Sequence, residues 1–123
     1  MIRKIRAETL DLFESAVRSK GMTVFARVDH HKGAAAVGLE LRPTEVLIFG
    51  NPKIGTLLMQ GDQLAGIDLP LKVLAWQDEQ GAVWLAYNDP AWIVKRHGIH
   101  DRDAVVEKMQ GALKNFAELA TQN

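Results

Sequence analysis

The chain has 123 residues, with 15 Lys and Arg against 15 Asp and Glu, and no cysteine. This length is typical of one domain, spanning residues 1–123. The lack of cysteine excludes a cystine framework, a Cys-ligated zinc and a thiol nucleophile. Balanced charge argues against nucleic-acid binding. No stretch suits a signal peptide or a membrane span, so we expect a soluble, cytoplasmic protein without a membrane role.

The first half predicts a helix, two strands and a second helix. Residues 1–5 are too short to assign, although they could be a remnant edge strand. Apolar spacing predicts a helix over residues 8–20 that ends at Gly21, followed by a strand over residues 22–28. Residues 29–38 read as a connection with one helical turn at 34–37.

A second strand, over residues 45–49, leads into a short helix that extends to about Met59. Asn51 can cap the free amides of this helix, and Pro52 suits its first position. Residues 60–70 are predicted to form a loop.

The second half predicts a hairpin and two helices. Residues 71–77 and 82–88 flank a type I turn at residues 78–81, followed by a bulge, which places Trp76 opposite Trp84. Asp89 caps a short helix that ends at Gly98, and Asp101 caps a final helix to about residue 121. The apolar stripe of that final helix comprises Val105, Met109, Ala112, Phe116 and Leu119.

The predicted sheet is apolar on both sides. One side of the hairpin carries Val73, Ala75, Val83 and Leu85. The other side carries Leu74, Trp76, Trp84 and Ala86. A sheet with one face in water would alternate apolar and polar residues. We therefore expect helices on one face, and a second subunit, a ligand or the chain's own loop on the other. The predicted class is α+β, with a single antiparallel sheet of about four to five strands and helices packed on one face.

Ordered motifs resemble the domain-of-unknown-function family 302 (DUF 302). They lie at residues 21–30 (GMTVFARVDH), 47–52 (LIFGNP), 66–70 (GIDLP) and 87–90 (YNDP), within a resemblance that covers residues 9–119. The resemblance implies a TBP-like, β-α-β4-α-like sheet, a prokaryotic protein and a homodimer. It implies no activity, and a fold similar to that of the TATA-binding protein does not indicate DNA binding.

Histidine and carboxylate patterns offer weak metal candidates. Asp29, His30 and His31 are ligand types, but neighbours in a strand point to opposite faces, so a polar strand end is the favoured interpretation. Gly98 interrupts the helix between His97 and His100, which favours His97 as a helix-terminal residue. No nucleophile elbow, Walker loop or dinucleotide motif is present. We predict no metal and no cofactor.

Polar residues at the ends of elements are the candidate ligand-binding residues. The strand-to-helix junction at Asn51 can hold an anion near Lys53 and Thr56, although plain capping is the favoured interpretation. Asn and Asp at such ends usually serve caps and turns, yet binding sites are also built there. The candidates are Asn51, Lys53, Thr56, Asp68, Tyr87, Asn88, Asp89 and His30, with Arg42 placed beside Tyr87 and Asn88 at a pocket mouth.

These observations favour a homodimeric small-ligand-binding protein without demonstrated catalysis. The alternative is a protein-interaction or assembly module that uses an apolar sheet face, and an enzyme of unknown class ranks third. A closed pocket with polar lips would favour the first hypothesis, and a flat exposed apolar face would favour the second.

Overall fold

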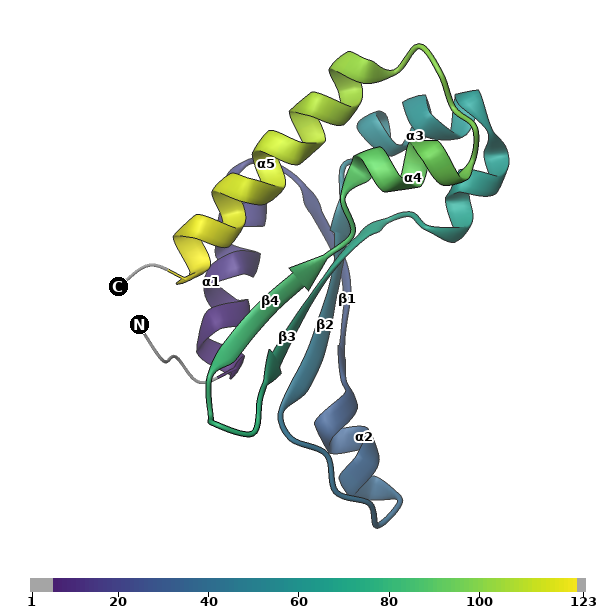
Figure 1. The fold of residues 1–123 in the computed structure, drawn as a ribbon. Helices are drawn as coiled ribbons and strands as arrows, with labels where there is room; N and C mark the ends of the chain where they lie inside the picture. Colours follow the sequence, from purple (N-terminus) through teal and green to yellow (C-terminus); the bar gives the residue numbers. More distant parts are fainter. Residues whose placement is uncertain (1–5, 122–123) are drawn as a thin grey trace.

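One antiparallel sheet organises the chain, and the computed structural model describes residues 6–121 (Figure 1). The four strands lie in the order β1-β2-β3-β4, which confirms the predicted α+β class. The candidate strand at residues 1–5 lies outside the described residues. In chain order the elements are α1 (Arg6–Ser19), β1 (Thr23–Asp29), α2 (His30–Ala36), β2 (Thr44–Gly50), α3 (Pro52–Gly61), the 3-10 helix η1 (Gln63–Ile67), β3 (Leu71–Gln77), β4 (Val83–Tyr87), α4 (Pro90–Arg96) and α5 (Asp103–Thr121).

Helices α1 and α5 cover one face of the sheet (Figure 1). Phe13 of α1 is fully buried, and its ring contacts Phe49 of β2 at 5.3 Å between centroids and Phe116 of α5 at 5.7 Å. Both contacts are edge-to-face, the arrangement that the charge distribution of aromatic rings favours. This aromatic cluster therefore joins the sheet, α1 and α5 in one core.

Helix α5 is rotated relative to the predicted stripe. Met109 and Phe116 are buried as expected, but Leu119 is 45% exposed. The helix packs mainly against α1, so its buried stripe turns toward α1. Its buried residues are Val106, Met109, Leu113, Phe116 and Ala120.

The predicted cap of α5 is also wrong. Asp101 has a φ of 61°, outside the extended region that an N-cap residue usually adopts. Its carboxylate accepts a hydrogen bond from Nη1 of Arg102 at 2.9 Å, and the helix itself begins at Asp103.

The β3–β4 hairpin has the predicted register, with Trp76 opposite Trp84. Gly81 adopts a φ of 82°, the left-handed conformation that the bulged turn requires. The Asp78 carboxylate accepts hydrogen bonds from the amides of Gln80 and Ala82, each at 2.9 Å. It also accepts one from the indole of Trp84 at 2.8 Å, so the turn and the stacked tryptophan pair support each other.

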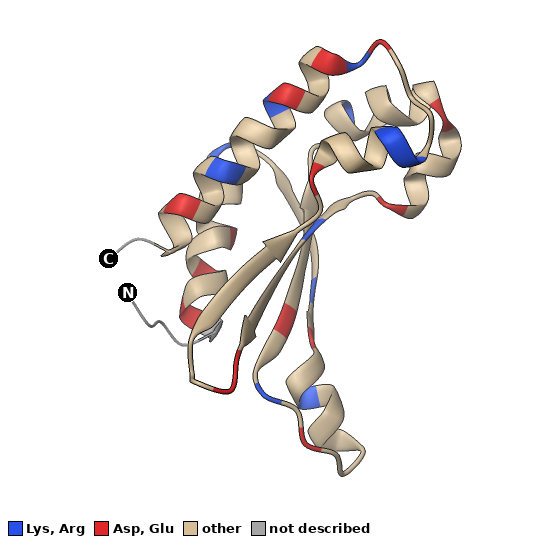
Figure 2. Cartoon of the chain, in the orientation of Figure 1, with Lys and Arg blue, Asp and Glu red and all other residues tan. Residues whose placement is uncertain are grey.

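The second face of the sheet is uncovered by the described part of the chain. A row of apolar residues crosses all four strands, because Val28 pairs with Val46, Val46 with Leu74 and Leu74 with Ala86. Trp84, in the neighbouring row, is 48% exposed. Strand β4 carries no charged residue (Figure 2). We call this surface the open face.

On the face of the sheet that the helices cover, charged residues join α1 to β1 and β2. Arg27 of β1 donates hydrogen bonds to Glu45 of β2 at 3.0 and 3.2 Å, to Asp11 at 2.7 Å and to Glu14 at 3.2 Å. Burial on its own lowers the pKa of Arg27, but the three carboxylates outweigh it and raise that pKa. The guanidinium thus stays charged and ties α1 to β1 and β2.

Helix α2 replaces the predicted connection. The Asp29 carboxylate accepts a hydrogen bond from the amide of Lys32 at 2.9 Å and caps the helix, which spans His30–Ala36. None of the residues of α2 is buried, and the helix projects from the end of the sheet opposite α3 and α4 (Figure 1).

Candidate functional site

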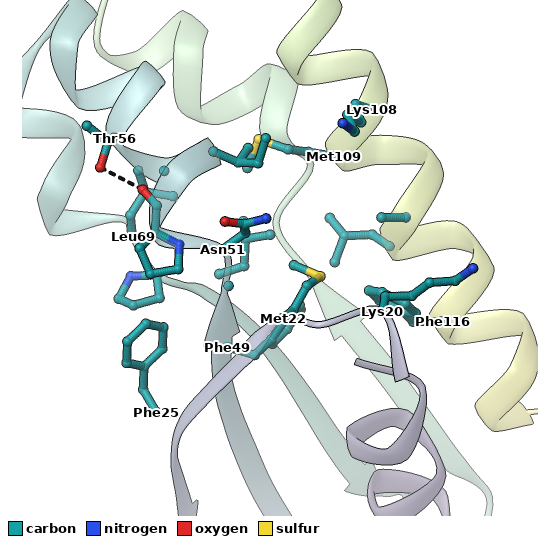
Figure 3. Close-up of a pocket in the computed structure, with 18 of the residues that line it drawn as sticks. Lys20, Met22, Phe25, Phe49, Asn51, Thr56, Leu69, Lys108, Met109 and Phe116 are labelled. Atoms are coloured by element: carbon teal, nitrogen blue, oxygen red, sulfur yellow. Dashed lines mark hydrogen bonds between the residues drawn. The ribbon is translucent and has the colours of Figure 1, made fainter. Parts of the chain in front are cut away.

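A cavity of about 540 Å³ lies at the end of the sheet, between α3 and α5 (Figure 3). Its walls come from the start of β1, the end of β2, the residues before β3, and the two helices. This volume is within the usual range of small-molecule sites. The residues that line it include Met22, Phe25, Phe49, Ile54, Met59, Leu69, Pro70, Met109, Leu113 and Phe116.

Asn51 lies in the middle of the cavity residues (Figure 3). Its side-chain oxygen accepts a hydrogen bond from the amide of Lys53 at 3.0 Å, so Asn51 caps α3 as predicted. Its backbone oxygen accepts hydrogen bonds from the amides of Ile54 at 2.9 Å and of Gly55 at 2.8 Å. Because Asn51 already pairs with these first-turn amides, the free backbone donors that an anion needs at a helix N-terminus are missing.

Thr56 lines the cavity and Lys53 does not. The Thr56 hydroxyl donates to the backbone oxygen of Pro52 at 2.6 Å, one turn earlier in α3. Lys53 is exposed on the same helix. The predicted junction thus contributes Asn51 and Thr56 to the cavity.

Positive charge gathers at the rim. Lys20, at the end of α1, and Lys108, in α5, both line the cavity, together with the amide side chain of Asn115. No Asp or Glu is among the described residues that line it. The cavity is therefore apolar inside and basic at its edge.

Asp68 belongs to a separate cluster. Its carboxylate accepts hydrogen bonds from Nε2 of His97 at 2.6 Å and from Nη1 of Arg96 at 2.7 and 2.8 Å. The hydrogen bond from His97, followed by the charge of Arg96, holds the pKa of Asp68 below its ordinary value of 3.8. His97 lies at the end of α4, as predicted, and the cluster ties η1 to α4.

The residues around Asp89 also serve the structure. Its carboxylate accepts from Nε2 of Gln110 at 2.8 Å and from the amide of Ala91 at 2.9 Å, which lowers the pKa of Asp89. Asp89 thereby caps α4 and links it to α5. Tyr87 and Asn88 are exposed beside it at the end of β4, and neither lines the cavity.

The predicted pocket mouth with Arg42 is wrong. Arg42 donates to the backbone oxygen of Gln77 at 3.2 Å, whereas Tyr87 pairs with Val73, four residues earlier in β3. Four residues of a strand span about 13 Å. The antiparallel pairing likewise places His30, which follows β1, at the far end from Asn51.

Most residues of the cavity were not predicted from the sequence. Lys20, Met22 and Phe25 follow α1, and Lys108, Ala112 and Asn115 lie on α5. The last three are spaced i, i+4 and i+7, the spacing of one helix face. This pattern of a cation, a small residue and an amide on one helix face was the sequence signal that could have indicated the cavity.

The fold and the cavity define a single-sheet α+β domain with a small-molecule-sized site. Residues 4–116 match the family described as "Domain of unknown function DUF302". The chain belongs to this family, as its motifs predicted.

A solved structure has the same fold. It is an uncharacterized conserved DUF302 protein from Bacillus stearothermophilus, with a TM-score of 0.85 and 18% sequence identity. The similarity covers 97% of this chain and 93% of that chain. At this identity the match shows the fold alone.

Curated relatives share a closer sequence match over part of their length. "Fluoride-specific ion channel FluC 1" of Brucella suis is 53% identical over 93 residues, which cover 76% of this chain and 37% of that protein. Proteins named FluC 1 of Brucella abortus and FluC 2 of Brucella melitensis are also 53% identical, with 34% of each covered. This chain thus spans about a third of the length of these relatives.

Residues 6–121 lack two further features. They contain no helix with the length and apolar character to cross a membrane. They also contain no group of three or more His, Cys, Asp or Glu side chains placed to hold a metal ion.

The Asp68 cluster predicts a specific pH dependence of stability. A lowered pKa means that the ionised carboxylate stabilises the folded state above pH 3.8, and that this contribution is lost as the pH falls through the lower folded-state value. We expect Asp68→Asn to reduce the free energy of unfolding at pH 7, and the difference from the natural protein to shrink below pH 3.8. Urea denaturation across this range measures it. Glu79→Gln, in the exposed hairpin turn, controls for net charge, and a difference that does not change with pH would contradict the prediction.

Proposed function

We propose that this DUF302 domain binds a small molecule with an apolar body in the cavity between α3 and α5. One observation carries the proposal: a chain of 123 residues keeps about 540 Å³ of apolar-walled space beside its core. The space opens to solvent at its rim, and small-molecule sites are typically such concave, mostly apolar and pre-formed clefts. Filling this space with an apolar ligand would recover contacts that the walls lack without it.

The walls suit ligand binding. Met22, Met59 and Met109 all line the cavity, and the unbranched thioether side chain adapts to irregular shapes. Phe49 and Phe116 support this lining from the core side, since both are fully buried against Phe13 and are held rigid there. One side of the cavity is therefore rigid and the other adaptable.

Methionine methyl resonances give a direct test. Three of the four methionines line the cavity. We expect octan-1-ol, an uncharged probe, to shift the 13C-methyl signals of Met22, Met59 and Met109 saturably. The affinity should exceed that of hexan-1-ol by roughly sixteenfold, on the basis of about 0.8 kcal/mol for each buried methylene.

A filled cavity provides the control. Ala112→Phe adds a ring to the cavity wall and should abolish the shifts, whereas Ala104→Phe, at an exposed position of α5 outside the cavity, should leave them unchanged. Shifts that persist in Ala112→Phe, or the absence of binding to the natural protein, would disprove the cavity as a ligand site.

We further propose that the protein works as a homodimer joined through the open face. The face is apolar from β1 to β4. Among the described residues that pair across the strands on this face, Lys72 is the one that carries a charge. A patch with so little charge can meet its own copy across a twofold axis without repulsion. Trp84 is 48% exposed, so burying its remaining surface would contribute about 2–3 kcal/mol, at about 25 cal/mol per Å².

The dimer prediction is that Trp84→Glu abolishes self-association. We expect the natural protein to sediment as a dimer at micromolar concentration and the variant to sediment as a folded monomer, because a charge would be buried in the interface. Glu79→Lys, at the exposed turn, controls for charge change near the hairpin. A natural protein that is monomeric at every concentration, or a Trp84→Glu variant that stays dimeric, would disprove this interface.

The Brucella relatives favour a second candidate function, an accessory role to a fluoride channel. The names of those proteins describe a fluoride-specific ion channel, and this chain matches about a third of their length. The described residues contain no membrane-spanning helix. We propose that the matched segment is an extramembrane domain of those proteins, and that this chain performs the same accessory function.

Fluoride tolerance tests the accessory role. The Brucella suis relative would be expressed in a fluoride-sensitive bacterium with and without the matched 93 residues. We expect removal of the segment to change the tolerated fluoride concentration severalfold at equal abundance of channel in the membrane. Equal tolerance of both forms would argue against the accessory role.

A further inference from the structure

We infer that the cavity selects a single-chain amphiphile with an anionic head group, whose apolar chain fills the cavity while Lys20 and Lys108 hold the head. The inference rests on the proposed function, that the cavity binds a small molecule, and adds the charge and shape of that molecule.

Charge is the first argument. The chain as a whole is neutral, with 15 basic and 15 acidic residues, but the described lining of the cavity contains Lys20 and Lys108 and no acidic side chain. Within residues 6–121 neither lysine forms an ion pair. Two unneutralised ammonium groups at one rim favour an anion and disfavour a cation.

The layout of the walls is the second argument. Figure 3 shows Lys20 and Lys108 on the α5 side, whereas Phe25 and Leu69 lie on the opposite side. On α5 the residues Lys108 and Asn115 are separated by two turns, or about 10 Å. Ala112 lies between them and its small side chain leaves room. A ligand with one charged end and one apolar end matches the division of the cavity into a lysine side and a Phe25 and Leu69 side.

The first turn of α3 excludes a compact anion as the preferred ligand. The amides of Lys53, Ile54 and Gly55 already donate to Asn51, and the Thr56 hydroxyl donates to Pro52. Inorganic phosphate or sulfate would find apolar walls and no free backbone donors there. The apolar part of the ligand must therefore supply most of the binding.

Volume sets the size of the chain. At about 30 Å³ for each water-sized unit, a cavity of about 540 Å³ holds on the order of 18 such units. Probes with an eight-carbon chain therefore fit with space remaining. Affinity should increase about fourfold for each methylene added in this size range.

The experiment compares head groups on one chain length. Octanoate, octyl phosphate, octan-1-ol and octyltrimethylammonium are titrated below micelle-forming concentrations, with the methyl signals of Met22, Met59 and Met109 as the readout. We expect octanoate and octyl phosphate to bind at least fivefold more tightly than octan-1-ol, and the cation to bind most weakly. The two anions distinguish a carboxylate from a phosphate head.

Lysine variants locate the head group. The double variant Lys20→Gln with Lys108→Gln should weaken the binding of octanoate at least fivefold. Its affinity for octan-1-ol should stay within twofold of that of the natural protein. Lys32→Gln with Lys114→Gln, which removes the same charge outside the cavity, should change neither. Because the rim is exposed, added salt should reduce the preference for the anions.

The outcomes separate this inference from the proposed function. If octan-1-ol binds in the cavity as tightly as octanoate, or if the lysine pair has no effect on octanoate, the anionic preference is wrong and the cavity still binds a ligand. If none of the probes shifts the methionine signals, the proposed function and this inference are both wrong.

Discussion

The contact of Phe13 with Phe49 and Phe116 is the interaction on which the rest of the structure depends. It joins α1, the sheet and α5 through one buried ring. Phe49 and Phe116 also line the cavity. The same aromatic rings that stabilise the core therefore support the lining of the candidate site from behind, so core packing positions this side of the site.

Local signals made much of the fold predictable. Asn51 followed by Pro52, and Asp89 followed by Pro90, each begin a helix, because a side-chain oxygen meets the free amides and proline needs no donor. The turn at Asp78 set the pairing of the tryptophans. Such signals act within a few residues. The rotation of α5 depends on its contact with α1, which lies far away in the sequence, and so it was not predicted.

The candidate site was harder to predict because its residues come from distant segments. Asn51 and Thr56 were identified from one junction, but Lys20 reaches the same rim from the segment after α1, and Lys108 reaches it from α5. Polarity at the ends of elements was a poor guide. Asp68 and Asp89 are satisfied by His97, Arg96 and Gln110, and these pairs hold helices together. The cavity is marked by apolar and cationic residues, which a search for polar clusters passes over.

Phe25 relates the cavity to the open face. The pairing of β1 shifts between Val24 and Ala26, so Phe25 is the extra residue of a bulge. Its ring lies beside Gly50, since a Cβ added to that glycine would be 4.0 Å from Cε2 of Phe25. Phe25 lines the cavity and is 49% exposed. Ala26 follows directly and pairs with Ile48. Phe25 thus lies between the proposed ligand cavity and the surface proposed for dimer contact, one residue before Ala26 of the open face.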